Sequence, residues 1–186
     1  DLKDYVYWSD IFKSYQSNRA SMEGTLLMPM AGLGSRFNNT EYKLPKPLIK
    51  VNKKAMSVKA YKDIPAAKNN IAVLRKDQAG IDDLKRTLRN EFINLNIIEL
   101  DKLTNGQAIT CYQALKEVED LSGPLTISAC DNGVIFNNDE LKSLLSDEDV
   151  DIIVWAAKGY PGASRNPDMY GWLHADENNK ILGVSV

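Results

Sequence analysis

The sequence predicts a three-layer α/β domain with a mostly parallel central sheet. Short apolar runs alternate along the chain with segments whose apolar residues recur at helical spacing, and this alternation is typical of a parallel sheet covered by helices. The composition agrees, because 44% of the 186 residues are hydrophobic and 26% are charged, as in globular domains that bury one core. Near the C-terminus, two alternating runs flank the polar turn DENN and predict an antiparallel hairpin.

The first 24 residues differ from the rest of the chain. Trp8, Ile11, Phe12 and Tyr15 recur at helical spacing, which predicts an amphipathic helix, and residues 18–24 are typical of a connector. We therefore expect a helical extension over residues 1–24 and a main domain over 25–186. Because the chain begins with an aspartate and ends within the strand-like run KILGVSV, we expect a fragment whose domain is truncated at its C-terminal end.

Five apolar runs of the main domain predict buried strands. They are TLLMPM (25–30), NIAVLRK (70–76), INLNIIEL (93–100), LTISAC (125–130) and DIIVWAA (151–157). Ligands of parallel α/β sheets bind beyond the carboxyl ends of the strands. Residues that follow the first, third and fourth runs, from Ala31, Asp101 and Cys130 onward, should therefore line one edge of the sheet.

Three helices are predicted between these strands. Ile81, Leu84 and Leu88 mark the apolar face of one helix, with Asp82 and Arg86 expected to pair at i,i+4 outside that face. The second helix is marked by apolar residues at 108, 111, 115 and 118, and the third covers DELKSLL (139–145), capped by an asparagine at 137 or 138.

A glycine turn follows the first strand directly. Gly32 and Gly34 allow backbone N–H groups to approach an anion without a side chain in the way. Phe37 stands where the dinucleotide fingerprint needs its third glycine, and no Gly-Lys-Ser/Thr follows as in a Walker A loop. A plain strand-to-helix turn explains a bare G-x-G equally well.

The flank of this turn is basic. Residues 36–54 contain six lysines and arginines but one acid, although the formal charge of the whole chain is −2. Arg36 directly follows the turn, and Lys46 lies between Pro45 and Pro47, which stiffen the segment. A stiff cation loses less entropy when it binds a phosphate. The alternative is a solvated basic surface.

These residues together resemble a known family. GLGSRFNNTEYKLPKP (32–47) and the following LIKVNKKAM (48–56) resemble the signature of the sugar-phosphate nucleotidyltransferases, also called nucleoside-diphosphate-sugar pyrophosphorylases. The resemblance covers residues 26–186 and implies the Rossmann-like nucleotide-diphospho-sugar transferase fold. It also implies a reaction in which a nucleoside triphosphate and a sugar 1-phosphate give a nucleotide sugar and pyrophosphate, for surface polysaccharide biosynthesis.

The resemblance assigns roles to the turn and its flank. Arg36 would stabilise charge on the departing pyrophosphate, and Lys46 would bind phosphate near the reacting phosphorus. The backbone around the triphosphate would come from Ala31, Gly32, Leu33, Gly34 and Ser35. An independent physical argument agrees, because phosphoryl-type transfer needs positioning and charge neutralisation more than covalent chemistry.

The segment after the third strand resembles the family's base-recognition segment. Gly106 would let the backbone approach a planar base, and Gln107 would read the edge of that base with a donor and an acceptor. Thr104 belongs to the same expected nucleotide site. The alternative is a helix capped by Thr104 or Asn105.

Asp131 ends the fourth predicted strand in the sequence CDNG. A carboxylate there suits Mg²⁺ held against phosphate oxygens, and the family carries a metal-binding aspartate after this strand, so Mg²⁺ is the expected cofactor. As a bare feature, Asp-Asn-Gly is a common turn. We interpret Cys130 as a tolerated small residue and not as a nucleophile.

The last segment resembles the family's sugar-contacting region. Tyr170 and Gly171 would contact the sugar, whereas His174 and Trp172 are interpreted as structural residues. The family's later Glu-Lys-Pro and second metal-binding aspartate do not occur before Val186. This is a second reason to expect a truncated domain.

The composition also excludes classes of partner. A pI of about 5.5 and a charge of −2 argue against a general nucleic-acid binder, and no apolar run reaches the roughly 20 residues of a membrane span. Cys111 and Cys130 form no CxxC and are interpreted as buried free thiols. Without a visible signal peptide, we expect a cytoplasmic protein whose partners are the two substrates, with an oligomer possible.

Two other functions remain open at this stage. One is a non-catalytic domain of the same fold that binds nucleotide or sugar phosphate. The other is a nucleotide-sugar-dependent glycosyltransferase, which would carry a D-x-D where this chain has CDN.

Overall fold

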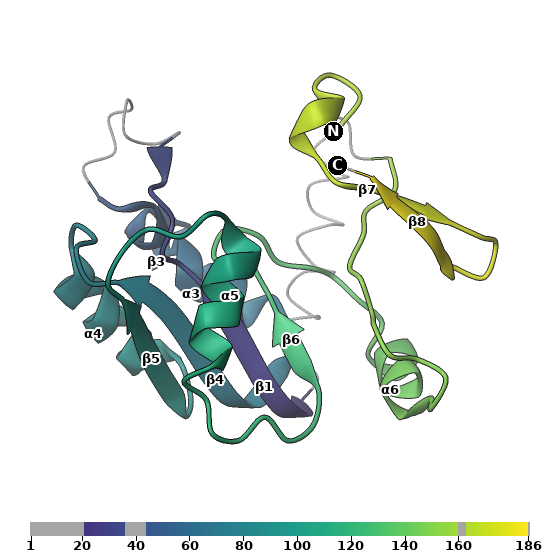
Figure 1. Ribbon diagram of the computed structural model, residues 1–186, viewed down its shortest axis with the longest axis horizontal. Helices are drawn as coiled ribbons and strands as arrows, with labels where there is room; N and C mark the ends of the chain where they lie inside the picture. Colours follow the sequence, from purple (N-terminus) through teal and green to yellow (C-terminus); the bar gives the residue numbers. More distant parts are fainter. Residues whose placement is uncertain (1–20, 36–43, 160–162, 186) are drawn as a thin grey trace. The chain divides into compact units, whose positions relative to one another are not determined.

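A parallel sheet of four strands forms the centre of the structure. The computed structural model describes residues 21–35, 44–159 and 163–185, so the helix expected around Trp8 lies outside the described residues. The sheet contains β1 (Ser21–Pro29), β4 (Ala66–Arg75), β5 (Leu95–Leu100) and β6 (Leu125–Ile127) in the order β5-β4-β1-β6 (Figure 1). Every pairing in it is parallel, which confirms the predicted α/β class.

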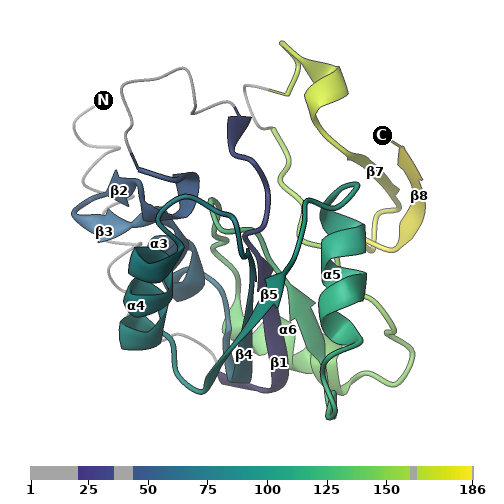
Figure 2. The same ribbon diagram turned by 60° about the vertical axis from the view of Figure 1, so that its left-hand side comes forward.

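Helices cover both faces of this sheet. Figure 2 shows α3 (Met56–Lys62) and α4 (Ile81–Glu91) on one side and α5 (Gln107–Leu115) on the other. Between β1 and α3 the chain forms the short helix η1 (Lys46–Leu48) and a small hairpin of β2 (Lys50–Val51) and β3 (Lys54–Ala55). Helix α6 (Asn138–Ser146) follows β6 along the chain. The three-layer arrangement follows from strands that are apolar on both faces.

The core consists of two clusters, one on each face of the sheet. Successive side chains of a strand point to opposite faces, so Met28 packs with the α3 and α4 side while its neighbour Leu27 packs with the α5 side. On the first side, Leu84 and Leu88 of α4 are fully buried, as the helical spacing predicts. On the second side, Cys111 and Ala114 of α5 are buried.

Several boundaries differ from those expected. Strand β1 begins at Ser21, so residues 21–24 belong to the sheet and not to a connector. The strand pairs with β4 from its first residue and shifts register between Met22 and Thr25. Strand β6 ends at Ile127 instead of at residue 130. Helix α3 was not predicted, because its seven residues MSVKAYK mix polar and small side chains.

Two local predictions on the helices can be compared with the structure. Arg86 pairs with Asp83 at i,i+3 and not with Asp82, since residues three and four apart are both neighbours on a helix surface. Asn137 is the predicted cap of α6: its Oδ1 accepts hydrogen bonds from the N–H groups of Asp139 (3.0 Å) and Glu140 (3.4 Å).

The chain divides into two compact units, residues 1–145 and 146–186. The second unit contains η2 (Pro167–Met169) and the predicted antiparallel hairpin of β7 (Trp172–Ala175) and β8 (Ile181–Ser185). The strand predicted over residues 151–157 is wrong, because the structure assigns no strand there. Ile152 is 76% exposed, so the apolar run lacks the neighbouring strand and the covering layer that a buried strand requires.

Within the described parts of the chain, the structure contains no helix that is both long enough and apolar enough to cross a bilayer.

The burial of α4 predicts a large effect of truncation. Leu84→Ala should lower the free energy of unfolding by about 2–5 kcal/mol, because Leu84 is fully buried and its removal leaves a cavity. Ile93→Ala is the control: Ile93 is 67% exposed, and its truncation should change stability by less than about 0.5 kcal/mol. Urea denaturation measures both. Equal effects of the two variants would show that α4 does not pack as described.

Cys130 predicts a loss of stability at alkaline pH. Burial raises the pKa of its thiol from an ordinary value of 9.0 to about 11. Below pH 9 both the folded and unfolded chains keep the proton; between pH 9 and about 11 only the folded chain keeps it. Stability from this group is therefore lost as the pH rises through that range, by about 2–3 kcal/mol.

The measurement is urea denaturation at pH 8, 9 and 10 for wild type and Cys130→Ala. The two stabilities should converge as the pH rises. Parallel pH dependences for the two proteins would contradict the assignment of this effect to Cys130.

Candidate functional site

The glycine turn leaves the sheet at the carboxyl end of β1. The N–H of Met30 donates to the carbonyl oxygen of Val73 (2.8 Å), which continues the ladder one residue past β1. Ala31 is still buried, whereas Gly32, Leu33 and Ser35 are exposed. Gly34 has φ +61° and a Cβ added to it would lie 3.3 Å from Cβ of Lys46. Arg36 lies outside the described residues.

Lys46 lies directly beside this turn on a firmly held segment. It is the first residue of η1, and the hydroxyl of the buried Ser57 donates to the carbonyl oxygen of Pro47 (2.8 Å). Proline on both sides restricts the backbone further. The glycine turn and the Pro-Lys-Pro segment belong to one sequence motif, and they are also neighbours in space.

Asp131 joins these two segments from the other side of β1. Its Oδ2 forms an ion pair and hydrogen bond with Nζ of Lys46. The side chains of Lys46 and Asp131 are 22% and 38% exposed, so the pair lies at the surface of the first unit and not in its core. Three separate parts of the sequence meet here: the turn after β1, the start of η1, and the loop after β6.

The loop that carries Asp131 is anchored against α3. The N–H of Val134 donates to the carbonyl oxygen of Asp63 (3.2 Å), the residue that directly follows α3. A Cβ added to Gly133 would lie 2.2 Å from Cβ of Asp63, closer than any real contact. Glycine is therefore required at 133 for the loop to pass this close, and the close passage fixes the course of the loop two residues after Asp131.

Lys46 and Asp131 meet where the order of strands in the sheet reverses direction. From β1 the chain adds β4 and then β5 on one side, and it later returns to add β6 on the other side of β1. In open α/β sheets, ligands bind outside the carboxyl ends of the strands at such a reversal, which here lies between β1 and β6. The glycine turn follows β1 and Asp131 follows β6, so both flank the reversal.

The segment expected to bind a base lies at the start of α5. Gly106, with φ +95°, is the N-cap of α5, and no side chain caps the helix. The alternative in which Thr104 or Asn105 caps this helix is therefore wrong. The hydroxyl of Thr104 instead lies 2.5 Å from that of Thr110. Gln107, the first residue of the helix, is exposed and makes no side-chain hydrogen bond to the described residues.

The expected sugar-contacting residues belong to the second unit. Tyr170 directly follows η2, and Gly171 leads into β7. The indole N–H of Trp172 donates to the carbonyl oxygen of Pro167 (3.0 Å), which ties the hairpin to η2. His174 lies opposite Gly183 in that hairpin.

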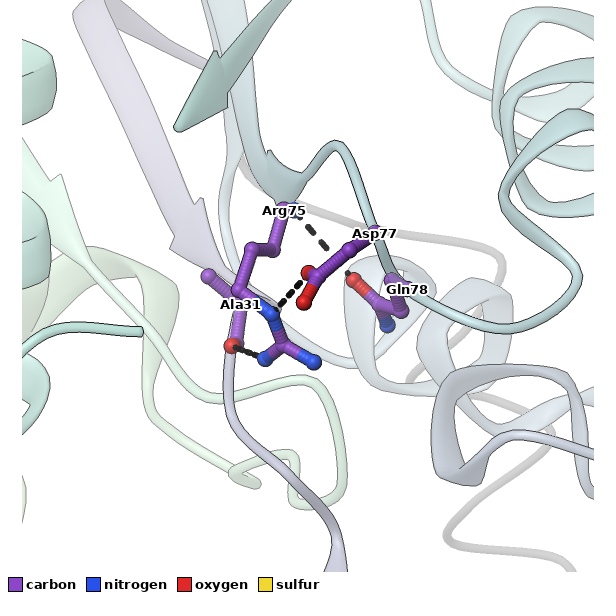
Figure 3. Close-up of polar contacts among 4 residues, drawn as sticks. All are labelled: Ala31, Arg75, Asp77 and Gln78. Atoms are coloured by element: carbon purple, nitrogen blue, oxygen red, sulfur yellow. Dashed lines mark hydrogen bonds and ion pairs between the residues drawn. The ribbon is translucent and has the colours of Figure 1, made fainter. Parts of the chain in front are cut away.

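The structure adds an arginine that the sequence analysis did not select. Arg75 is the last residue of β4 and is only 7% exposed. Its Nη1 donates to the carbonyl oxygen of Ala31 (2.5 Å), and its Nε pairs with Oδ1 of Asp77 (Figure 3). Gln78, also buried, accepts from the backbone N–H of Arg75 at 3.4 Å. The sequence does contain a signal for this residue, because Arg75 is a charged residue directly after the apolar run IAVL.

Sequence-level comparisons found no relative: no protein-family model and no curated protein matches the chain. Solved structures do match. An inositol-1-phosphate CTP transferase from T. maritima aligns with 87% of this chain and 63% of its own, at 18% identity and a TM-score of 0.60. HddC from Yersinia pseudotuberculosis, complexed with GMP-PN, aligns with 87% of this chain and 68% of its own, at 15% identity and a TM-score of 0.56.

A third structure is a nucleoside-diphosphate-sugar pyrophosphorylase from Vibrio cholerae RC9. It aligns with 63% of this chain at 20% identity and a TM-score of 0.48. The chain spans 52% of that protein and 63% of the T. maritima transferase. At these identities the likeness concerns the fold alone: this chain has the α/β fold of the T. maritima transferase and of HddC.

Proposed function

We propose that this protein transfers a nucleotidyl group from a nucleoside triphosphate to a sugar 1-phosphate, or to a related polyol or alcohol phosphate, and releases pyrophosphate. The observation that carries the proposal is the meeting of Lys46 and Asp131 beside the glycine turn, at the strand-order reversal of a nucleotidyltransferase-type fold. A cation and an exposed glycine backbone are suited to binding a phosphate chain, and a carboxylate beside them is suited to a metal ion that neutralises that chain.

The turn and Lys46 bind the triphosphate in this proposal. Exposed backbone between Ala31 and Ser35 offers N–H donors to phosphate oxygens, and Lys46 contributes a point charge. On binding, the ammonium of Lys46 exchanges the carboxylate of Asp131 for a phosphate oxygen. Arg36, outside the described residues, is proposed to stabilise the departing pyrophosphate.

Asp131 fits the role of a magnesium ligand. The described residues contain no group of three His, Cys, Asp or Glu side chains placed to hold a metal. Mg²⁺ does not need such a cage, because it commonly keeps several waters and takes one or two carboxylates together with substrate phosphates. The partly exposed carboxylate of Asp131 suits that mode. Bound there, Mg²⁺ would neutralise charge on the phosphate oxygens.

The chemical step is a direct displacement at the α-phosphorus. An oxygen of the acceptor phosphate forms a bond to that phosphorus as the bond to the bridging oxygen of the β-phosphate breaks, and pyrophosphate leaves with the bonding electron pair. The residues of the chain position the two phosphates and neutralise their charge, and no covalent enzyme intermediate forms.

The remaining residues of the proposal select the substrates. Gly106 and the exposed Gln107 are proposed to contact the base, with Thr104 beside them, at the end of the sheet where β5 leads into α5. Tyr170 and Gly171, in the second unit, are proposed to contact the sugar. Two solved neighbours are a CTP transferase and a protein complexed with GMP-PN, which supports a nucleotide substrate without selecting a base.

The decisive experiment measures pyrophosphate release by the full-length protein. Each common nucleoside triphosphate is combined with a panel of sugar and polyol phosphates in the presence of Mg²⁺. We expect turnover with one triphosphate and a loss of at least about 100-fold in Lys46→Gln, since removal of one charge-neutralising group typically costs this much. Triphosphate binding without turnover for any acceptor would instead support a non-catalytic binding domain.

Gly32→Ala tests the phosphate site without disturbing the fold. A Cβ added to Gly32 meets no atom within 4 Å, and its φ is not in the left-handed region, so the variant should keep its thermal stability. We expect inorganic tripolyphosphate to bind about 10-fold more weakly, because the methyl group stands where the phosphate approaches the backbone. Isothermal titration calorimetry measures the affinity.

Gly183→Ala is the matched control, because Gly183 is also surrounded by open space but lies in the hairpin of the second unit. It should leave tripolyphosphate affinity unchanged. If Gly32→Ala also binds as tightly as wild type, the glycine turn is not the phosphate site.

A further inference from the structure

The carbonyl oxygen of Ala31 takes its hydrogen bond from an unusual donor. The backbone of β1 bonds to β4 on one side and to β6 on the other, and the last bond to β4 runs from the N–H of Met30 to the carbonyl oxygen of Val73. At Ala31 the pairing with β4 has ended, yet only 3% of this residue's surface is exposed. A buried carbonyl needs a donor, and the guanidinium of Arg75 supplies it at 2.5 Å (Figure 3).

This bond fixes the orientation of the first peptide of the glycine turn. The peptide joining Ala31 to Gly32 is planar and trans, so its carbonyl oxygen and its N–H point in opposite directions. Because the oxygen points at Arg75, the N–H of Gly32 points away from Arg75. That N–H makes no hydrogen bond to the described residues, and the space around Cα of Gly32 is open.

The guanidinium itself is held by a second contact. Its Nε pairs with Asp77, two residues along the chain, whose side chain is 69% exposed. Burial costs an arginine its hydration, and hydrogen bonds from its planar fork of donors to fixed partners offset that cost. Here one side of the fork is held by Asp77 and the other holds Ala31. Lysine does not reproduce this geometry, because its three donors share one nitrogen instead of forming a planar fork.

We propose that Arg75 is a positioning residue for phosphate binding. By holding the carbonyl of Ala31 it directs the N–H of Gly32 toward the triphosphate, with Asp77 fixing the orientation of the guanidinium. This inference rests on the proposed function, since it concerns the same phosphate site. It adds a residue from β4 to a site otherwise built from the segments after β1 and β6.

The test compares Arg75→Lys and Asp77→Asn with wild type. The probes are inorganic tripolyphosphate and the nucleoside of whichever triphosphate supports turnover. For Arg75→Lys we expect tripolyphosphate to bind about 10-fold more weakly, equivalent to about 1.4 kcal/mol, with nucleoside affinity unchanged. Asp77→Asn should show a smaller loss of about threefold, because the arginine remains but one of its anchors is weakened.

Arg86→Lys is the matched control. Arg86 is also paired with an aspartate, Asp83, but it lies exposed on α4, so its replacement should leave both affinities unchanged. In ¹H–¹⁵N NMR spectra, tripolyphosphate should move the Gly32 amide of wild type and of Arg86→Lys strongly. The shift should be smaller in Arg75→Lys. A role confined to stability would lower the melting temperature without separating the two ligands in this way.

The outcomes separate the inference from the proposed function. Failure of wild type to bind tripolyphosphate overturns the proposed function and this inference with it. Tight binding by wild type with equal affinity in a folded Arg75→Lys overturns the inference alone, as does an equal loss for tripolyphosphate and nucleoside. If Arg75→Lys does not fold, Asp77→Asn decides: unchanged tripolyphosphate affinity in that variant overturns the inference.

Discussion

The pairing of β1 with a parallel strand on each side is the constraint on which the rest of the structure depends. With β4 on one side and β6 on the other, β1 is a central strand, and its side chains must be apolar on both faces. The same pairing brings the carboxyl ends of all three strands to one edge. Strand pairing therefore brings together a turn, a charged loop and a buried arginine that are far apart in the sequence.

The apolar core of this arrangement was predictable from the sequence because its elements have strong periodic patterns. The run TLLMPM is buried on both faces, and Leu84 and Leu88 recur one turn apart, so strand and helix were each recognisable. The run DIIVWAA has the same apolar texture, but texture reports only that side chains favour burial. A strand also needs a hydrogen-bonding neighbour, and no local pattern reveals whether one exists.

The candidate site shows the same division between local and tertiary information. Lys46 and Asp131 were selected separately, from a proline-flanked motif and a strand end, and the structure brings their side chains into contact. Arg75 was not selected, because its partner is a backbone oxygen contributed by a residue of another strand's loop. Gly133 was treated as part of a turn, whereas its importance lies in the passage of the loop against Asp63. Contacts of this kind depend on tertiary packing, and the sequence near each residue does not encode them.

The ion pair between Lys46 and Asp131 has a consequence for the free protein. Both side chains are partly exposed, and such pairs contribute at most about 1 kcal/mol, so little free energy opposes their separation when other charges arrive. Until then the contact limits the conformations of a long lysine side chain. Dissolved ions screen exposed charges over about 8 Å at physiological ionic strength. Salt therefore weakens the contact that restricts these two side chains. As a result, ionic strength changes the conformational ensemble of the site before any ligand binds.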